Sequence, residues 1–187
     1  MQIGSEGRER SELDLFHSGE NFHAYRFLGA HKMNINGTDG LMFRTWAPNA
    51  KSVSVVGPFN NWDRNVHRMN RISFGGVWEC FIAENFDQYT MYKYSIETYD
   101  DSCVMKSDPY AYHYETRPNT ASVYVDIDGY EWHDQDWQKE KASHESYSSP
   151  MNIYEMHAGS WRKYKDGNYF SYEKLADDLI PYVKDMG

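Results

Sequence analysis

Short alternating apolar runs, separated by turn residues, dominate the chain from about residue 41 to residue 126. Five runs are rich in Val, Ile, Phe, Tyr and Trp, and each predicts a strand: LMFRTWA, KSVSVVG, GVWECFIA, MYKYSIET and SVYVDI. In the second run Val53 and Val55 share one face while Ser52 and Ser54 share the other, which indicates a strand with one face toward solvent. Strands at this spacing, without helices between them, predict an antiparallel β-sandwich.

The pattern changes after Gly129. The polar stretch DQDWQKEKASHESYSS predicts a short helix and then a linker that ends at Pro150. The apolar-leaning run MNIYEMHAGS that follows predicts a buried strand.

The last segment, SYEKLADDLIPYVKDMG, has the periodicity of an amphipathic helix. Ser171 is placed to cap its start and Gly187 to end it, while Pro181 inside the pattern predicts a kink or a broken turn. The apolar positions that fall near one face are Leu175, Leu179, Val183 and Met186.

A single strand, loop and helix cannot bury their own faces, because a parallel strand needs neighbours on both sides. Either this C-terminal part packs on the sandwich in an unusual way or the natural protein continues, and we favour continuation. We therefore expect partial disorder or self-association beyond Pro150, where the apolar faces lack partners.

Composition narrows the classes of partner. The 187 residues are 40% hydrophobic and 25% charged, which is typical of a folded globular protein. The formal net charge of -9 argues against nucleic acid, and no stretch is long and apolar enough for a membrane span. The charged opening MQIGSEGRERSELDLF lacks the apolar core of a signal peptide, which predicts a cytoplasmic location.

Aromatic residues make up 17% of the chain, a surplus that fits a β-sandwich core or a surface that stacks on flat ligands. No metal site or cofactor is predicted. Cys80 and Cys103 lack a metal or redox spacing, and His113, His133 and His157 lie far apart in sequence.

Four segments, in the correct order, resemble the bacterial 1,4-α-glucan branching enzyme family. FHSGENFHAYRFLGAH is similar to its N-terminal segment, and RTWAPNAKSVSVVGPFNNWD to the first strands and sugar-facing turn of its family 48 carbohydrate-binding module. MYKYSIE and KSDPYAYHYETRPNTASVYVD are similar to the later strands of that module. PMNIYEMHAGSW and YEKLADDLIPYVKDMG resemble the first strand and helix of a glycoside hydrolase family 13 barrel.

The resemblance implies a mostly β fold: an immunoglobulin-like antiparallel β-sandwich, followed by the first βα unit of a truncated (β/α)8 barrel. The implied divisions are an N-terminal segment at 1–40, a glucan-binding sandwich at 41–128, a linker at 129–149 and the incomplete barrel at 150–187.

The implied reaction cuts an α-1,4 bond and transfers the severed chain to a 6-hydroxyl, forming a branch in glycogen biosynthesis. Retention of configuration needs two carboxyl groups about 5 Å apart, which in this family come from later barrel strands. We therefore expect no catalytic residue here. The adjacent Asp177 and Asp178 point in different directions on a helix, and Asp134 and Asp136 flank a solvated linker.

The resemblance also implies a glucan-binding site. In the turn FNNWD, Trp62 offers a ring for stacking on pyranose faces, and Asn60 or Asn61 offers an amide for the hydroxyl groups. Lys93 and Asn119 are further candidates by the same resemblance. For Trp62 the alternative role is packing against the sandwich edge or the barrel.

Two hypotheses follow. The chain is either part of a branching enzyme, whose sandwich positions glycogen or malto-oligosaccharides for a barrel supplied by the rest of the parent chain, or a stand-alone glucan-binding regulatory module without activity. The barrel-like run MNIYEMHAGSW favours the first.

Overall fold

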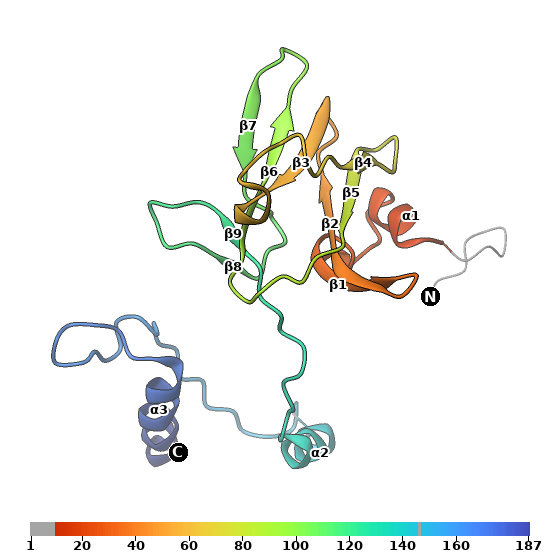
Figure 1. The fold of residues 1–187 in the computed structure, drawn as a ribbon. Coiled ribbons are helices and arrows are strands. Elements are labelled where there is room, and N and C mark those ends of the chain that lie inside the picture. Colours follow the sequence, from red (N-terminus) through yellow and green to blue (C-terminus); the bar gives the residue numbers. More distant parts are fainter. Residues whose placement is uncertain (1–9, 146) are drawn as a thin grey trace. The chain divides into compact units, whose positions relative to one another are not determined.

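The computed structural model describes residues 10–145 and 147–187, and the chain divides into two compact units, Met1–Gly129 and Tyr130–Gly187 (Figure 1). Residues 1–9 of the predicted N-terminal segment, and residue 146 of the predicted linker, lie outside the described residues.

The first unit contains a four-stranded antiparallel sheet in the order β1-β2-β5-β4. Its strands are β1 (Gly29–Ile35), β2 (Thr38–Trp46), β5 (Val77–Ile82) and the short β4 (Asn70–Arg71). The strand β1 was not among those predicted, and it pairs with β2 along its whole length. The first sheet therefore begins inside the segment 1–40.

The second antiparallel sheet has the order β3-β6-β9-β8, and β7 also pairs with β6. Its strands are β3 (Ser52–Val56), β6 (Met91–Glu97), β7 (Cys103–Lys106), β8 (His113–Tyr114) and β9 (Ser122–Val123). β6 is the centre of this sheet, because it pairs with β3 on one side and with β7 and β9 on the other.

The two sheets share one hydrophobic core, which makes the first unit an immunoglobulin-like β-sandwich, as the strand pattern predicted. Phe43 of β2 meets Tyr92 of β6 edge to face, with ring centroids 5.2 Å apart. Other members alternate along their strands, as inward-facing positions should. They include Leu41, Val53, Val55, Trp78, Ile82 and Tyr94.

One predicted surface position is buried instead. Ser54, expected on a solvent-facing side of β3, is only 4% exposed. The chain returns along this strand: Val55 N donates to His67 O at 2.9 Å, and Met69 N donates to Val53 O at 2.8 Å. This returning segment protects an edge that the sequence pattern left open.

A carboxyl group lies inside the sandwich. Asp108 is fully buried, and its Oδ2 accepts hydrogen bonds from Tyr92 Oη at 2.8 Å and Tyr94 Oη at 3.1 Å. Its backbone N donates to Ser122 Oγ at 2.7 Å, which fixes β9 beside the segment 107–111. Burial raises the pKa of Asp108 above its ordinary value, despite the hydrogen bonds that lower it.

Three short helices complete the first unit: α1 (Glu12–His17), η1 (Ala24–Arg26) and η2 (Pro58–Asn60). The helix α1 starts with a capping box between Ser11 and Asp14. His17 Nε2 lies 2.8 Å from Ser73 Oγ, so this helix is tied to the turn between β4 and β5.

The second unit contains the two predicted helices, α2 (Gln135–Ser143) and α3 (Tyr172–Met186). Ser171 caps α3 by accepting a hydrogen bond from Lys174 N at 3.2 Å, as predicted. The helix continues through Pro181 without the predicted break.

The predicted strand at 151–160 is wrong for this structure, in which residues 151–157 belong to no strand and Ile153 is 84% exposed. The physical reason is that a strand needs a neighbouring strand for its backbone hydrogen bonds, and the described part of the second unit offers none.

Candidate functional site

The turn that carries the predicted site follows β3 and is organised by Asn60. This side chain is 6% exposed: its Oδ1 accepts from Gly57 N at 3.0 Å, and its Nδ2 donates to Val55 O at 2.9 Å. Nδ2 also lies 3.0 Å from His67 Nδ1. The amide of Asn60 is thus engaged within the protein, and the residue determines the shape of the turn.

The next two residues are presented to solvent. Asn61 and Trp62 both have a positive φ, of 54° and 60°, and Trp62 N donates to Gly57 O at 2.9 Å. The indole of Trp62 is 41% exposed. A bulky residue is rare in this backbone region, and such strain gathers at sites that hold a side chain for a purpose.

The turn lies beside the central strand of the second sheet (Figure 1). In the register of β3 and β6, Val56 is opposite Lys93, and a Cβ atom on Gly57 would lie only 2.5 Å from Met91 O. Only glycine allows this approach of the two backbones.

Lys93 is on the outer side of the sheet, because its neighbours Tyr92 and Tyr94 face the core. Its Nζ donates to Thr120 Oγ1 at 2.7 Å, and Ser107 Oγ donates to the backbone O of Thr120. The adjacent Asn119 is exposed, and its Nδ2 donates to Glu115 Oε1 at 3.2 Å.

The structure therefore joins Lys93 to the loop of Asn119 through Thr120, which sequence reasoning missed. No motif marked Thr120, since a hydroxyl in a polar loop is ordinary until the fold places a lysine beside it. An exposed indole, exposed amides and an ammonium group on neighbouring elements offer the stacking surface and hydrogen-bonding groups that a polyhydroxyl ligand can use.

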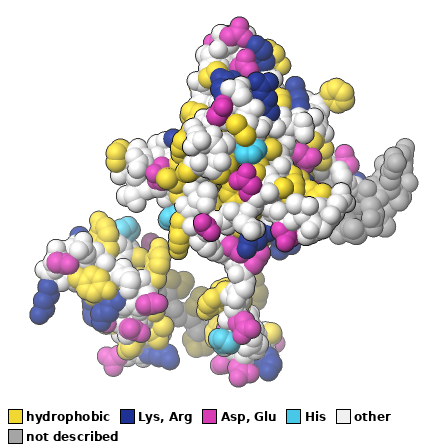
Figure 2. Space-filling model, viewed as in Figure 1, with side chains coloured by type: hydrophobic (Ala, Val, Ile, Leu, Met, Phe, Trp, Pro, Cys, Tyr) yellow, Lys and Arg dark blue, Asp and Glu magenta, His cyan; other side chains and the backbone are white. Residues whose placement is uncertain are grey.

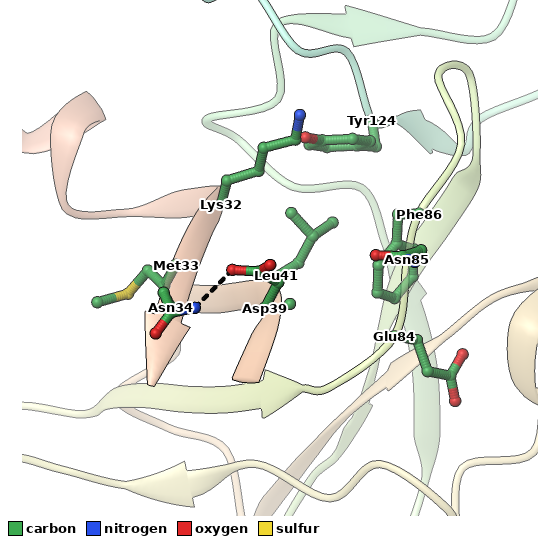
Figure 3. Close-up of a pocket in the computed structure, with 10 residues that line it drawn as sticks. Lys32, Met33, Asn34, Asp39, Leu41, Glu84, Asn85, Phe86 and Tyr124 are labelled. Carbon is green, nitrogen blue, oxygen red and sulfur yellow. Dashed lines mark hydrogen bonds between the residues drawn. The ribbon is translucent and has the colours of Figure 1, made fainter. Parts of the chain in front are cut away.

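A separate groove of about 510 Å³ lies between the first sheet and the segment after β5, and none of the five predicted residues lines it (Figure 3). Lys32 and Tyr124 lie side by side at one end of it. Asn34 Nδ2 donates to Asp39 Oδ1 at 2.7 Å near another. The groove is therefore separate from the predicted glucan-binding residues.

Asp178, one of the carboxylates considered in the sequence, makes two ion pairs. Its Oδ1 lies 2.6 Å from Lys174 Nζ and its Oδ2 lies 3.6 Å from Arg162 Nη1. Within residues 10–145 and 147–187, no cluster of His, Cys, Asp and Glu could hold a metal ion. Over the same residues, no helix is both long enough and apolar enough to span a bilayer.

Comparison with known protein families gives a match, and it falls in the first unit. Residues 27–111 match the family Carbohydrate-binding module 48 (Isoamylase N-terminal domain). The matched range lies within the first unit. The matched range contains Asn60, Asn61, Trp62 and Lys93, whereas Asn119 lies beyond it.

Curated relatives extend the similarity to nearly the whole chain. The chain is 45% identical over 171 residues to the 1,4-alpha-glucan branching enzyme GlgB of Bacillus cytotoxicus, covering 91% of this chain and 26% of that protein. It is 44% identical over 176 residues to the enzyme of the same name from Geobacillus stearothermophilus, covering 94% of this chain and 27% of that protein. The similarity is to the N-terminal region, so the chain spans about a quarter of these relatives.

Among solved structures, the pullulanase of Klebsiella pneumoniae complexed with maltotriose is similar over 53% of this chain and 9% of its own. The TM-score is 0.42 and the identity 27%.

Proposed function

We propose that this chain is the N-terminal part of a 1,4-α-glucan branching enzyme and that its family 48 module binds α-glucan. The observation that carries the proposal is the 45% identity over 91% of the chain to a branching enzyme. The exposed Trp62, held by a strained turn beside Lys93, supplies a contact site of suitable chemistry.

In this proposal Trp62 stacks on a pyranose ring, while Asn61 and Lys93 contact hydroxyl groups. Asn60 shapes the turn, because its amide group is already bonded to Gly57 and Val55. Asn119 is an accessory contact at the neighbouring loop. The ligands are glycogen and malto-oligosaccharides, and a cytoplasmic location belongs to the same proposal.

The second unit corresponds, in this proposal, to the start of the catalytic barrel. Its apolar side chains are unusually open for a folded protein: Ile153 is 84%, Ile180 51% and Met186 60% exposed. Figure 2 shows hydrophobic side chains on the surface of this unit among charged ones. The rest of the barrel would cover them, and it would also supply the catalytic carboxylates.

The test is binding of glycogen and malto-oligosaccharides by the purified chain and by Trp62→Ala, with the fold checked by circular dichroism. Trp46→Ala is the matched control, because Trp46 is also exposed, at 54%, but belongs to the first sheet. We expect binding to be lost in Trp62→Ala only. Equal binding by all three proteins would show that Trp62 does not contact glucan and would favour a packing role for it.

The alternative, a stand-alone glucan-binding module, differs in what the second unit does. We expect the chain alone to show no branching of amylose, and to gain activity only when joined to the remaining barrel of a relative. Glucan binding without any gain in such a fusion would favour the alternative.

A further inference from the structure

Two bulky side chains share an unusual backbone conformation. The non-glycine residues with positive φ in the described ranges are Asn36, Asn61, Trp62, Tyr89 and Asp101. Asn and Asp tolerate this region, whereas a large aromatic residue there is strained. Within the described residues, Trp62 and Tyr89 are therefore the two positions where an aromatic ring is presented from a strained backbone.

Tyr89 is held firmly by its backbone and is open at its side chain. Thr90 N donates to Asp87 O at 3.2 Å, closing a turn around Tyr89. Tyr89 N donates to Tyr124 O at 2.9 Å, and Tyr124 N donates to Thr90 O at 2.8 Å. The Tyr89 side chain is nevertheless 69% exposed.

An exposed imidazole extends this aromatic surface. The rings of Tyr89 and His113 meet edge to face, with centroids 6.3 Å apart and an interplanar angle of 77°. His113 is itself exposed, on the edge strand β8. Two rings in this arrangement present apolar faces with polar edges, which is the chemistry that pyranose recognition needs.

Register places His113 on the same face of the sheet as Lys93. Met91 is opposite Val123, and Val123 is opposite His113. The alternate row, Tyr92, Ser122 and Tyr114, lies on the side of Asp108, which hydrogen-bonds to all three. Tyr92 and Ser122 are buried there, whereas Tyr114 at the sheet edge is 42% exposed. Met91, Lys93 and His113 therefore share the opposite side of the second sheet, with the buried Val123 between Met91 and His113.

The turn of Trp62 follows β3, at one end of the strand order, and His113 lies on β8 at the other end. Three strand spacings of about 4.8 Å separate β3 from β8, roughly 14 Å in all. A ligand that contacts both ends must be extended, and a linear oligosaccharide is.

We propose that Tyr89 and His113 form a second contact area for the same α-glucan chain, at the far side of the second sheet from Trp62. This inference rests on the proposed function, and it adds that the module prefers long glucan chains to short ones.

The test compares maltotriose with maltoheptaose, titrated into the whole chain by calorimetry. We expect the wild-type chain to bind maltoheptaose more tightly. Tyr89→Gly should weaken maltoheptaose roughly two- to tenfold and leave maltotriose nearly unchanged, because one aromatic contact is lost. Trp62→Ala should weaken both ligands.

Tyr89→Gly is the informative variant because glycine relieves the positive φ. Its unfolding midpoint should not fall, so lost binding cannot be attributed to unfolding. Tyr89→Phe keeps the ring and should retain the preference. Tyr25→Ala is the matched control: Tyr25 is 42% exposed and lies edge to face with His23, at 5.9 Å, in the segment before β1.

If Tyr89→Gly binds both sugars as the wild type does while Trp62→Ala binds neither, the second contact area is refuted and the proposed function stands. An equal loss of both sugars in Tyr89→Gly also refutes it, because Tyr89 would then belong to a single short site. Failure of the wild type to bind either sugar would overturn the proposed function as well.

Discussion

The two units of this chain carry equally clear secondary-structure signals and differ in what those signals achieve. In the first unit, residues from both sheets form a buried cluster that includes Phe43, Val55 and Tyr94. In the described part of the second unit, no residue is buried. Its helix α3 is nevertheless capped and continuous, whereas the preceding strand signal at 151–160 produces no strand.

The difference follows from where the backbone hydrogen bonds are made. A helix satisfies its N–H and C=O groups within the segment, and its cap supplies more, so α3 forms without a core. A strand satisfies them only on another strand, so its signal needs neighbours that the sequence pattern does not include. Secondary structure can therefore form without burial, and the described part of the second unit has helices but no buried residue.

The largest effect should come from a cavity in the shared core. Phe43 is 1% exposed, and Phe43→Ala should lower the free energy of unfolding by about 3–5 kcal/mol. Urea unfolding, followed by circular dichroism, measures it. Ile180→Ala, at a position 51% exposed in α3, is the control and should leave that transition unchanged. Similar losses in both variants would show that the two units fold as one.

A smaller loss should follow from removing the amide that shapes the Trp62 turn. Asn60→Ala leaves Gly57 N and Val55 O without partners in a buried place, at a cost of about 1–3 kcal/mol. The same urea experiment measures it, and glucan titration should show weaker binding because the turn is released. The control is Asn61→Ala, whose exposed side chain should matter little for stability. An unaffected stability in Asn60→Ala would contradict the role given to this residue.

The buried carboxyl group should make the first unit less stable as pH rises. Burial raises the folded-state pKa of Asp108, so the unfolded chain loses this proton first, near pH 4. The stability of the wild type relative to Asp108→Asn should therefore fall as pH increases through that value, until the folded-state pKa is passed. Urea unfolding of both proteins between pH 3 and 7 provides the comparison.

In the second unit, the pH dependence of stability due to Asp178 should have the opposite sign to that due to Asp108. A hydrogen bond from Lys174 lowers the pKa of the half-buried Asp178 in α3. Any stability that Asp178 adds should therefore be present above its unfolded-state pKa and be lost as pH falls.

For Asp108, a wild-type stability advantage over Asp108→Asn that grew with pH would show that burial is not the dominant influence on its pKa.

The smallest effect on the chain as a whole should come from the α3 cap. Ser171→Ala removes the bond to Lys174 N and should destabilise this helix by about 1 kcal/mol. Helix content near 222 nm should drop slightly while the main unfolding transition stays in place. Ser171→Asp, which restores an acceptor, is the control. A shift of the main transition would indicate that α3 supports the sandwich.

The candidate site shows how far sequence reasoning reaches at the level of single residues. The motif FNNWD located the turn, and Lys93 was named by resemblance alone. Only the structure shows that Lys93 lies on the face opposite the core residues Tyr92 and Tyr94. The sequence did not predict that Asn60 is buried in the turn while Asn61 is exposed, because two neighbouring asparagines are chemically the same until the turn buries one of them. The bond from Lys93 to Thr120 joins positions 27 residues apart.

The sequence by itself determined the features that depend on local periodicity and chain chemistry. These are five of the strands between residues 41 and 126, namely β2, β3, β5, β6 and β9, together with the two helices after Gly129 and the Ser171 cap. Tertiary structure alone decided which strands pair, that β1 joins the first sheet, that the returning chain buries Ser54, and that residues 151–157 stay outside any sheet. Periodicity is recorded within each segment, whereas strand pairing and burial depend on what the rest of the chain places beside it.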